Sequence, residues 1–310
     1  MTRDALKVTA FWDRWIEHYV YEIGHRAKKL SEPFVKEDYR PQYAYEQAKT
    51  HFWLVMHRYS RGDPIAELAQ YMEPLLHYWE EAERLGQDVW TPAQQISRHS
   101  WAVNLDHYID CFWLVGLAVA LNIPDSQWQR LIALVGNEGE DTLLDRIIAT
   151  RQPNRRIGVS LCYPKPYARL LDTIDASPAK QAKLLAQFVD HWYVDIGKAA
   201  KTGRQKQAVP YKEPYWHGYH KIEGGYFGYW CLEAVAAVKA CHLDDSACIG
   251  HPHYPGDLLH PNKVTAGDPS RLPAILAGSI GAPPEPPFVA QPRNISTWEA
   301  LKLVIKNKLS

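Results

Sequence analysis

Two segments of the chain, residues 108–121 and 226–240, are apolar nearly all the way round a helix. A helix without a polar face is stable only when other parts of the protein cover it on every side. The sequence therefore predicts two buried central helices with amphipathic helices wrapped around them. Each segment is followed by a turn that holds an Asp-Ser pair, at 125–126 and 245–246, and such pairs often begin a short helix.

Apolar residues recur at helical spacing through most of the remaining chain. Thr-Pro at 91–92 and Ser-Pro at 177–178 are typical helix starts, because proline fits the first helical position. Pro74 lies inside the helical stretch 63–86 and should kink or split it. Only residues 157–163 could be extended, and nothing obvious pairs with them. The pattern predicts an all-α fold, a multi-helix bundle-like array around the two buried helices.

The last quarter of the chain differs in character. Prolines are frequent between residues 250 and 293, which predicts a mostly irregular segment at the surface. Ser296 and Glu299 have the spacing of a capping box, so we expect a final helix that docks back on the body. We expect an N-terminal region, 1–135, and a C-terminal region, 136–310, that form one compact unit.

Composition limits the classes of function. The chain has 310 residues, 46% of them hydrophobic, and a formal net charge of zero, so no overall charge attracts it to nucleic acid or to an anionic membrane. The five cysteines show no paired spacing, which is typical of reduced thiols in a cytosolic protein. Charged residues interrupt the N-terminus, and the longest apolar run, 111–121, is too short to span a bilayer. We expect a soluble cytoplasmic protein.

A histidine cluster raises one enzymatic alternative. His217, His220 and Glu223 lie close together, and His251 and His253 could join them as ligands of a metal-dependent hydrolase. The spacing argues against this site, because the well-defined helical motif needs two histidines four residues apart. We therefore expect hydrogen-bonded histidines and no metal cofactor.

Other catalytic and binding signatures are weaker. The chain has no G-x-S-x-G elbow and no glycine-rich phosphate loop after a predicted strand. Two basic stretches could contact nucleic acid, although a solvated face is the simpler interpretation at zero net charge. The basic stretches hold Arg146, Arg151, Arg155, Arg156, Lys165 and Arg169, and then Lys198, Lys201, Arg204 and Lys206.

Acidic residues cluster in the middle of the chain, where Glu138, Glu140, Asp141 and Asp145 fall within eight residues and no Lys or Arg stands among them. The simpler interpretation is a set of acids that complement the N-terminus of a helix. The functional interpretation is a surface patch that meets the positive groove of a DNA-binding enzyme and speeds association with it.

Glu233 stands inside the second apolar segment. An ionised carboxylate that is buried there needs a partner, and His220, Lys221 or a nearby tyrosine could supply one. Glu233 could be a catalytic acid. We favour an internal polar tie that fixes the Gly-Gly loop at 224–225 onto the central helix.

The segment from 220 to 257 resembles a known family. A Gly-Tyr-Trp block at 228–230, an Asp-Asp turn at 244–245 and a His-Pro-x-Tyr-Pro block at 251–255 stand in the order found in the C-terminal domain of the PoNi family, the immunity proteins of polymorphic nuclease effectors. The first 90 or so residues are similar in character to that family's N-terminal domain. The matching positions are His220, Lys221, Gly225, Gly228, Tyr229, Trp230, Glu233, Asp244, Asp245, His251, Tyr254 and Pro255.

The resemblance implies an all-helical cytoplasmic protein that binds and neutralises one cognate DNase toxin in bacterial competition. It implies no enzymatic activity, no cofactor, no membrane and no direct contact with nucleic acid. The layout is also similar to that of immunity proteins of type VI secretion effector pairs, and a homodimer is a possible assembly. Within this interpretation the matching positions determine the fold, and the acids at 138–145 are the candidate toxin contacts.

Overall fold

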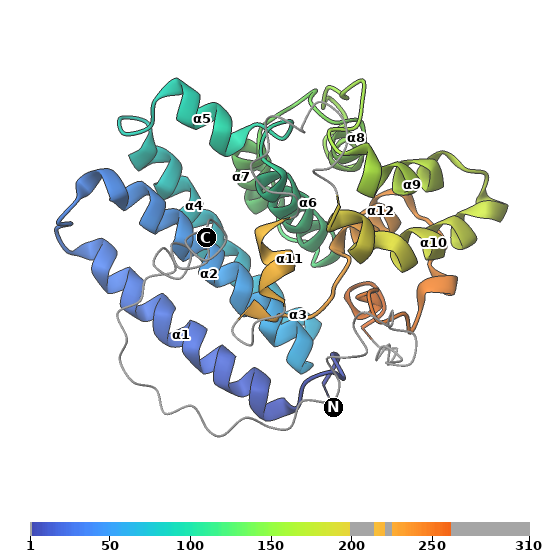
Figure 1. The fold of residues 1–310 in the computed structure, drawn as a ribbon, viewed down its shortest axis with the longest axis horizontal. Helices are drawn as coiled ribbons and strands as arrows, with labels where there is room; N and C mark the ends of the chain where they lie inside the picture. Colours follow the sequence, from blue (N-terminus) through green and yellow to red (C-terminus); the bar gives the residue numbers. More distant parts are fainter. Residues whose placement is uncertain (1, 199–213, 221–224, 262–310) are drawn as a thin grey trace, which may run out of the picture. The chain divides into compact units, whose positions relative to one another are not determined.

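The structure is a computed structural model that describes residues 2–198, 214–220 and 225–261. These residues form α-helices and short 3-10 helices with no strand among them, which confirms the all-α prediction (Figure 1). The α-helices are α1 (Thr9–Ser31), α2 (Arg40–Arg61), α3 (Ile65–Leu68), α4 (Met72–Gly86), α5 (Pro92–His99), α6 (Leu105–Ala120), α7 (Asp125–Val135), α8 (Thr142–Ala149), α9 (Pro164–Asp175), α10 (Pro178–Ile196), α11 (Tyr215–Tyr219) and α12 (Leu232–Cys241). The short 3-10 helices are η1 (Glu37–Tyr39), η2 (Ala69–Tyr71), η6 (Ser246–Cys248) and η7 (Gly256–Leu258).

The chain separates into two compact units, Met1–Pro273 and Ala274–Ser310. The second unit lies wholly outside the described residues, and so do the expected final helix and most of the proline-rich segment. The described part of that segment, 250–261, holds only the 3-10 helix η7. The boundary expected near residue 135 stays a prediction.

The N-terminal helices are arranged around α2, which packs against both α1 and α4 (Figure 1). The helical stretch that contains Pro74 is split, as predicted, into α3, η2 and α4, but the break lies at η2, before Pro74. Pro74 lies in the first turn of α4, where its missing N–H costs no helical hydrogen bond. The predicted starts at 91–92 and 177–178 are confirmed as well, since α5 begins at Pro92 and α10 at Pro178.

The first apolar segment forms the central helix α6, in which every residue from His107 to Val119 is buried. It packs against α12, and Gly116 allows the two backbones to approach closely. A Cβ at this position would lie 2.9 Å from the Leu232 carbonyl oxygen, so a larger residue would push the helices apart. The prediction of a buried pair of central helices is thus correct for α6 and α12.

The second apolar segment is helical only from Leu232 onward, so the prediction that the helix begins at 226 was wrong. Residues 226–231 are buried but not helical, and the Cys231 N–H donates to the His253 carbonyl at 2.8 Å. Gly228 has φ +101°, a left-handed conformation that does not occur inside a right-handed α-helix. No helix can therefore run through residue 228 into α12. Gly228 therefore shapes a turn and does not serve close packing between helices.

Candidate functional site

The acidic residues at 138–145 lie where the loop after α7 enters α8. Asp141 is the N-cap of α8 and is fully buried. Its carboxylate accepts hydrogen bonds from the backbone N–H groups of Leu143 at 2.9 Å, Leu144 at 2.8 Å and Cys162 at 2.7 Å. Burial raises the pKa of Asp141, and these N–H donors act against that rise. The predicted complement to a helix N-terminus is therefore present at this residue.

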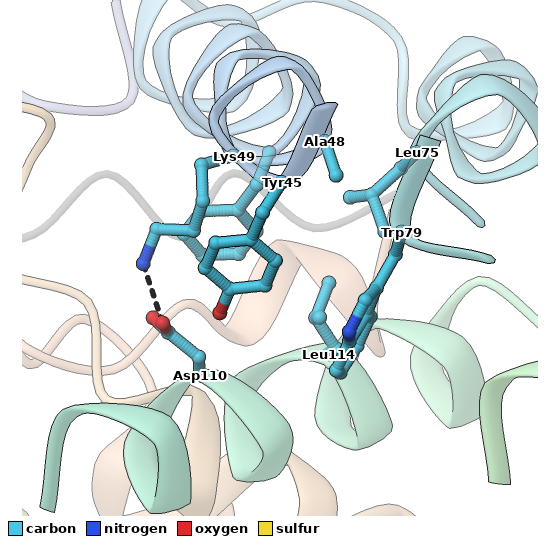
Figure 2. A pocket seen from close by; sticks show the side chains of 8 residues that line it. Tyr45, Ala48, Lys49, Leu75, Trp79, Asp110 and Leu114 are labelled. Carbon is cyan, nitrogen blue, oxygen red and sulfur yellow. Dashed lines mark hydrogen bonds and ion pairs between the residues drawn. The ribbon is translucent and has the colours of Figure 1, made fainter. Parts of the chain in front are cut away.

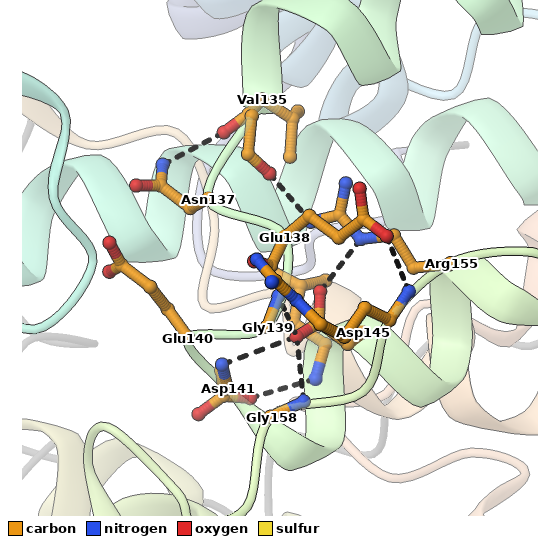
Figure 3. Close-up of polar contacts among 12 residues, drawn as sticks. Val135, Asn137, Glu138, Gly139, Glu140, Asp141, Asp145, Arg155 and Gly158 are labelled. Atoms are coloured by element: carbon orange, nitrogen blue, oxygen red, sulfur yellow. Dashed lines mark hydrogen bonds and ion pairs between the residues drawn. The ribbon is translucent and has the colours of Figure 1, made fainter.

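Asp145 is also fully buried, on the first turn of α8, and it holds two other loops (Figure 3). One carboxylate oxygen pairs with Arg155 Nε at 2.7 Å. The other accepts from the backbone N–H groups of Gly139 at 3.0 Å and Gly158 at 3.1 Å. Arg155 is only 6% exposed, so this member of the first basic stretch faces the interior and not a nucleic acid.

The two glutamates lie nearer the solvent. Glu138 is exposed, and its carboxylate accepts from the Arg156 backbone N–H at 2.5 Å. Glu140 is half-buried and accepts from the Trp101 backbone N–H at 3.0 Å and from Ser100 Oγ at 3.3 Å. Burial thus leaves Glu138 and Glu140 as the acids that a partner could meet, and their contact with a toxin stays a prediction.

Several residues of the basic stretches are occupied by acids on neighbouring elements. Arg146 pairs with Asp175 at 2.7 Å, and Arg169 pairs with Asp195 at 2.6 Å. Arg151 pairs at 2.6 Å with Asp125, whose side chain is almost fully exposed. Of the second stretch only Lys198 lies among the described residues. These pairs favour the interpretation of the basic residues as a solvated face.

Three histidines of the hydrolase alternative, His217, His220 and His253, pack around the ring of Tyr193, while the polar contacts of His217, His251 and His253 go to different residues. The His217 Nε2 atom lies 3.1 Å from the Tyr193 carbonyl oxygen, and the His251 Nε2 atom lies 2.9 Å from Asp190. The His253 Nδ1 atom lies 3.1 Å from the Tyr229 carbonyl oxygen. Within residues 2–198, 214–220 and 225–261, no group of three or more His, Cys, Asp or Glu could hold a metal ion. Glu223, the remaining member of the predicted site, lies outside these ranges.

His220 is 5% exposed and stands among aromatic rings, with centroids 4.3 Å from Phe227, 4.9 Å from Tyr229 and 5.1 Å from Trp216. Burial lowers the pKa of His220 well below its ordinary value. Burial also lowers the pKa of His253, to about 3. Both imidazoles are therefore neutral near pH 7 and serve as aromatic packing groups.

Glu233 is fully buried in the first turn of α12, and burial raises its pKa. Its Oε1 atom accepts a hydrogen bond from Tyr167 Oη at 3.0 Å. Tyr167 comes from α9, so the partner of Glu233 is a tyrosine, one of the predicted kinds, and the bond ties α9 to α12. The expected tie to the Gly-Gly loop stays a prediction, because Gly224 lies outside the described residues. A buried carboxyl group held by a neutral donor supports the structural interpretation of this residue.

The other positions of the matching motif connect distant parts of the chain. Trp230 Nε1 donates to Ser60 Oγ at 2.7 Å, and Ser60 Oγ donates to the Phe227 carbonyl at 2.7 Å. Tyr254 Oη donates to Asp245 at 2.6 Å. Among the remaining positions, Tyr229, His251 and Pro255 are buried, Gly225 is half-buried, Asp244 is exposed at the turn before η6, and Lys221 lies outside the described residues.

One polar group went unnoticed in the sequence. Lys49 of α2 forms an ion pair with Asp110 of α6 beside a small hollow whose walls include Trp79 and Leu114 (Figure 2). Burial and the neighbouring Asp110 raise the pKa of Asp106 to about 7. The four-residue spacing of Asp106 and Asp110 in an apolar helix was the available signal. The hollow has a volume of about 20 Å³, which holds a water molecule and no substrate.

These features define a class of protein. The described part is an all-α body in which Asp141, Asp145 and Glu233 serve internal contacts, and the hollow beside Lys49 and Asp110 has room for a water molecule. The class so defined is an all-α protein whose buried polar groups stabilise its own fold. Among the described residues, no helix combines the length and apolar character needed to cross a membrane.

The comparisons with known proteins identify the family. The chain matches "PoNe immunity protein (PoNi), N-terminal" over residues 3–133 and "PoNe immunity proteins (PoNi), C-terminal" over residues 139–258. It therefore belongs to the PoNi family of immunity proteins for polymorphic nuclease toxins, which confirms the resemblance.

One solved structure has the same fold. The crystal structure of protein PA2201 from Pseudomonas aeruginosa aligns with a TM-score of 0.63 and 18% sequence identity, over 84% of this chain and 89% of that chain. At this identity the likeness concerns the fold alone. No curated protein matches the chain in sequence.

Proposed function

We propose that this protein is the cytoplasmic immunity partner of one polymorphic nuclease toxin, which it binds and neutralises in the cell that makes both. The observation that carries the proposal is the family match across both halves of the chain, residues 3–133 and 139–258. The toxin is proposed to be a DNase that a type VI secretion system delivers to competing cells.

Neutralisation by binding sets physical requirements. A stable interface buries roughly 1,600 Å² in total, which a helical body of this size can supply on one face. Protection of the producing cell needs a dissociation constant in the nanomolar range, about −12 kcal/mol. A few anchor side chains are expected to carry most of that free energy.

The protein is proposed to act without turnover. The fully buried Asp141 and Asp145 stabilise loops, and Glu233 ties two helices together. Burial keeps His220 and His253 neutral, and the Lys49–Asp110 hollow has a volume of only about 20 Å³. These observations support a function at the surface and not a metal-dependent hydrolase.

Co-expression tests the proposal directly. The genes that neighbour this one are searched for a polymorphic nuclease, which is then induced in a susceptible host, with this protein or with an empty vector, and the two proteins are co-purified. We expect growth only when this protein is present, together with a complex that survives size-exclusion chromatography. The same protein should not protect against a nuclease toxin of an unrelated family. Equal killing with and without this protein, and no complex, would refute the proposal.

A further inference from the structure

The short segment 155–160, between α8 and α9, combines a fixed backbone with exposed apolar side chains, and we call it the 155–160 loop. Val159 is 100% exposed and Ile157 is 37% exposed. Between them, Gly158 is buried. Val159 therefore adds no burial to the stability of the fold, and Ile157 leaves more than a third of its surface in contact with solvent.

Hydrogen bonds hold the backbone of this loop at several points. The Gly158 N–H donates to Asp145 at 3.1 Å, and the Gly158 carbonyl accepts from Thr142 Oγ1 at 2.7 Å. The Ser160 carbonyl accepts from the Thr142 N–H at 3.0 Å. Both polar groups of Gly158 therefore form hydrogen bonds with α8, and the bond from its N–H to Asp145 is drawn in Figure 3. The side chains on either side of Gly158 are exposed.

The contact between the loop and α8 is close enough to require glycine. A Cβ at position 158 would lie 2.5 Å from the Asp141 backbone nitrogen, a distance that real Cβ atoms essentially never show. The buried Asp145–Arg155 pair anchors the start of the same loop. Two fully buried aspartates thus serve to fix a loop whose largest apolar side chains contact solvent.

We propose that the 155–160 loop is a recognition element that inserts Ile157 and Val159 into an apolar recess on the nuclease toxin. This inference rests on the proposed function and adds the surface through which binding occurs. A loop that is already ordered loses little conformational entropy on binding, so its apolar contacts contribute more of their free energy to affinity.

The charges beside the loop indicate the chemistry around that recess. In the described ranges, the side chains of Glu138 and Glu140 accept hydrogen bonds from neutral donors and form no ion pair. The Arg156 guanidinium donates to the Glu138 carbonyl at 2.6 Å, so these three side chains carry a net charge of −1. The complementary surface is an apolar recess with basic residues at its rim, as a nucleic-acid-binding protein presents.

The test is a pair of serine variants in the full-length protein. The double variant I157S/V159S removes both apolar side chains, and V35S is the matched control because Val35 is just as exposed (103%) in a different part of the chain. The dissociation constant for a catalytically inactive variant of the nuclease identified in the co-expression test is measured by isothermal titration calorimetry. We expect the double variant to bind about 100-fold more weakly, since burying a β-branched side chain contributes substantially to binding, and V35S to bind like the wild type.

The outcomes separate this inference from the proposed function. No binding by the wild type overturns both, whereas equal binding by the wild type and by I157S/V159S overturns the recognition loop alone. A photocrosslinking residue placed at position 159, with position 35 as the control, gives a second measurement that does not depend on the serine variant folding. A crosslink from position 159 to the nuclease supports the inference, and a crosslink only to a second copy of this chain, or none, contradicts it.

Discussion

Replacing Asp145 by alanine should be one of the most damaging single changes to the stability of this protein. The Asp145–Arg155 pair is buried, with the two side chains 0% and 3% exposed, and Asp145 also accepts from the backbone of Gly139 and Gly158. Removing one partner of a buried ion pair leaves an uncompensated charge and typically costs about 3–5 kcal/mol. The backbone N–H groups of Gly139, Asp141 and Gly158 would lose their acceptor, and this adds to the cost wherever water cannot reach them.

The matched control is Asp125→Ala. Asp125 pairs with Arg151 at 2.6 Å, a distance as short as that of the buried pair, but its side chain is 89% exposed. Exposed ion pairs contribute little, so this variant should keep the stability of the wild type. Urea unfolding followed by circular dichroism gives the free energy of unfolding of all three proteins. If Asp145→Ala loses no more free energy than Asp125→Ala, the argument for an acid-built platform under the 155–160 loop is wrong.

Three further predictions follow from buried groups. Glu233→Ala should lower the free energy of unfolding by roughly 3 kcal/mol or more, because it orphans the Tyr167 hydroxyl and opens a cavity. Glu233→Gln keeps an acceptor for that hydroxyl and should restore most of the lost stability, so equal losses for the two variants in urea unfolding would contradict a hydrogen-bonded tie. Burial raises the pKa of Asp4 from 3.8 to about 6, so the protonated carboxyl group favours folding below pH 4. The free energy of unfolding should fall by about 3 kcal/mol as the pH rises through 6. Asp4→Asn should remove this dependence, and parallel stability–pH curves for the two proteins would refute the prediction. Gly158→Ala should weaken toxin binding about tenfold, since displacing a preorganised loop misplaces its contacts. Gly24→Ala is the control, because a Cβ at this position of α1 meets no atom within 4 Å and should leave binding unchanged. The same affinity for both variants in calorimetry would show that the loop position does not matter.

Hydrophobic patterning was sufficient to predict the architecture of the described residues. The apolar run that became α6 has no polar face, and a helix of that kind has only one stable environment. The proline signals at 92 and 178 predicted two helix starts because they act locally, through the fixed φ of proline and its missing N–H. Features that depend on neighbouring residues in the sequence were therefore predicted well.

Features that depend on distant residues were predicted poorly. Residues 226–231 are as apolar as a buried helix, and composition alone cannot reveal that Gly228 turns the chain there. The acids at 141 and 145 were expected either to complement a helix N-terminus or to form a surface patch, and their burial could not be predicted because their partners, Cys162 and Arg155, come from loops later in the chain. The partner of Glu233 likewise comes from a separate helix, 66 residues away in the sequence.

The candidate site shows the same division. The sequence singled out the acidic segment, and the structure leaves Glu138 as its exposed acid. Sequence patterns offered no reason to select Ile157 or Val159, because these residues look like members of a short buried strand until their exposure is known. The motif positions in the C-terminal half identified the family, yet those placed by the structure lie mostly in the interior, so the residues that identify the family differ from those proposed to contact the toxin.

The most direct test of the account is a titration of the cognate nuclease with purified, metal-free immunity protein, with DNA cleavage as the readout. If this protein inhibits by tight binding, nuclease activity should fall linearly as the protein is added and reach zero near one chain of this protein per chain of nuclease. Dissociation of the complex should restore the activity. Complete inactivation by a small fraction of an equivalent would indicate turnover and contradict a binding mechanism. Full nuclease activity in the presence of excess protein would contradict the immunity function itself.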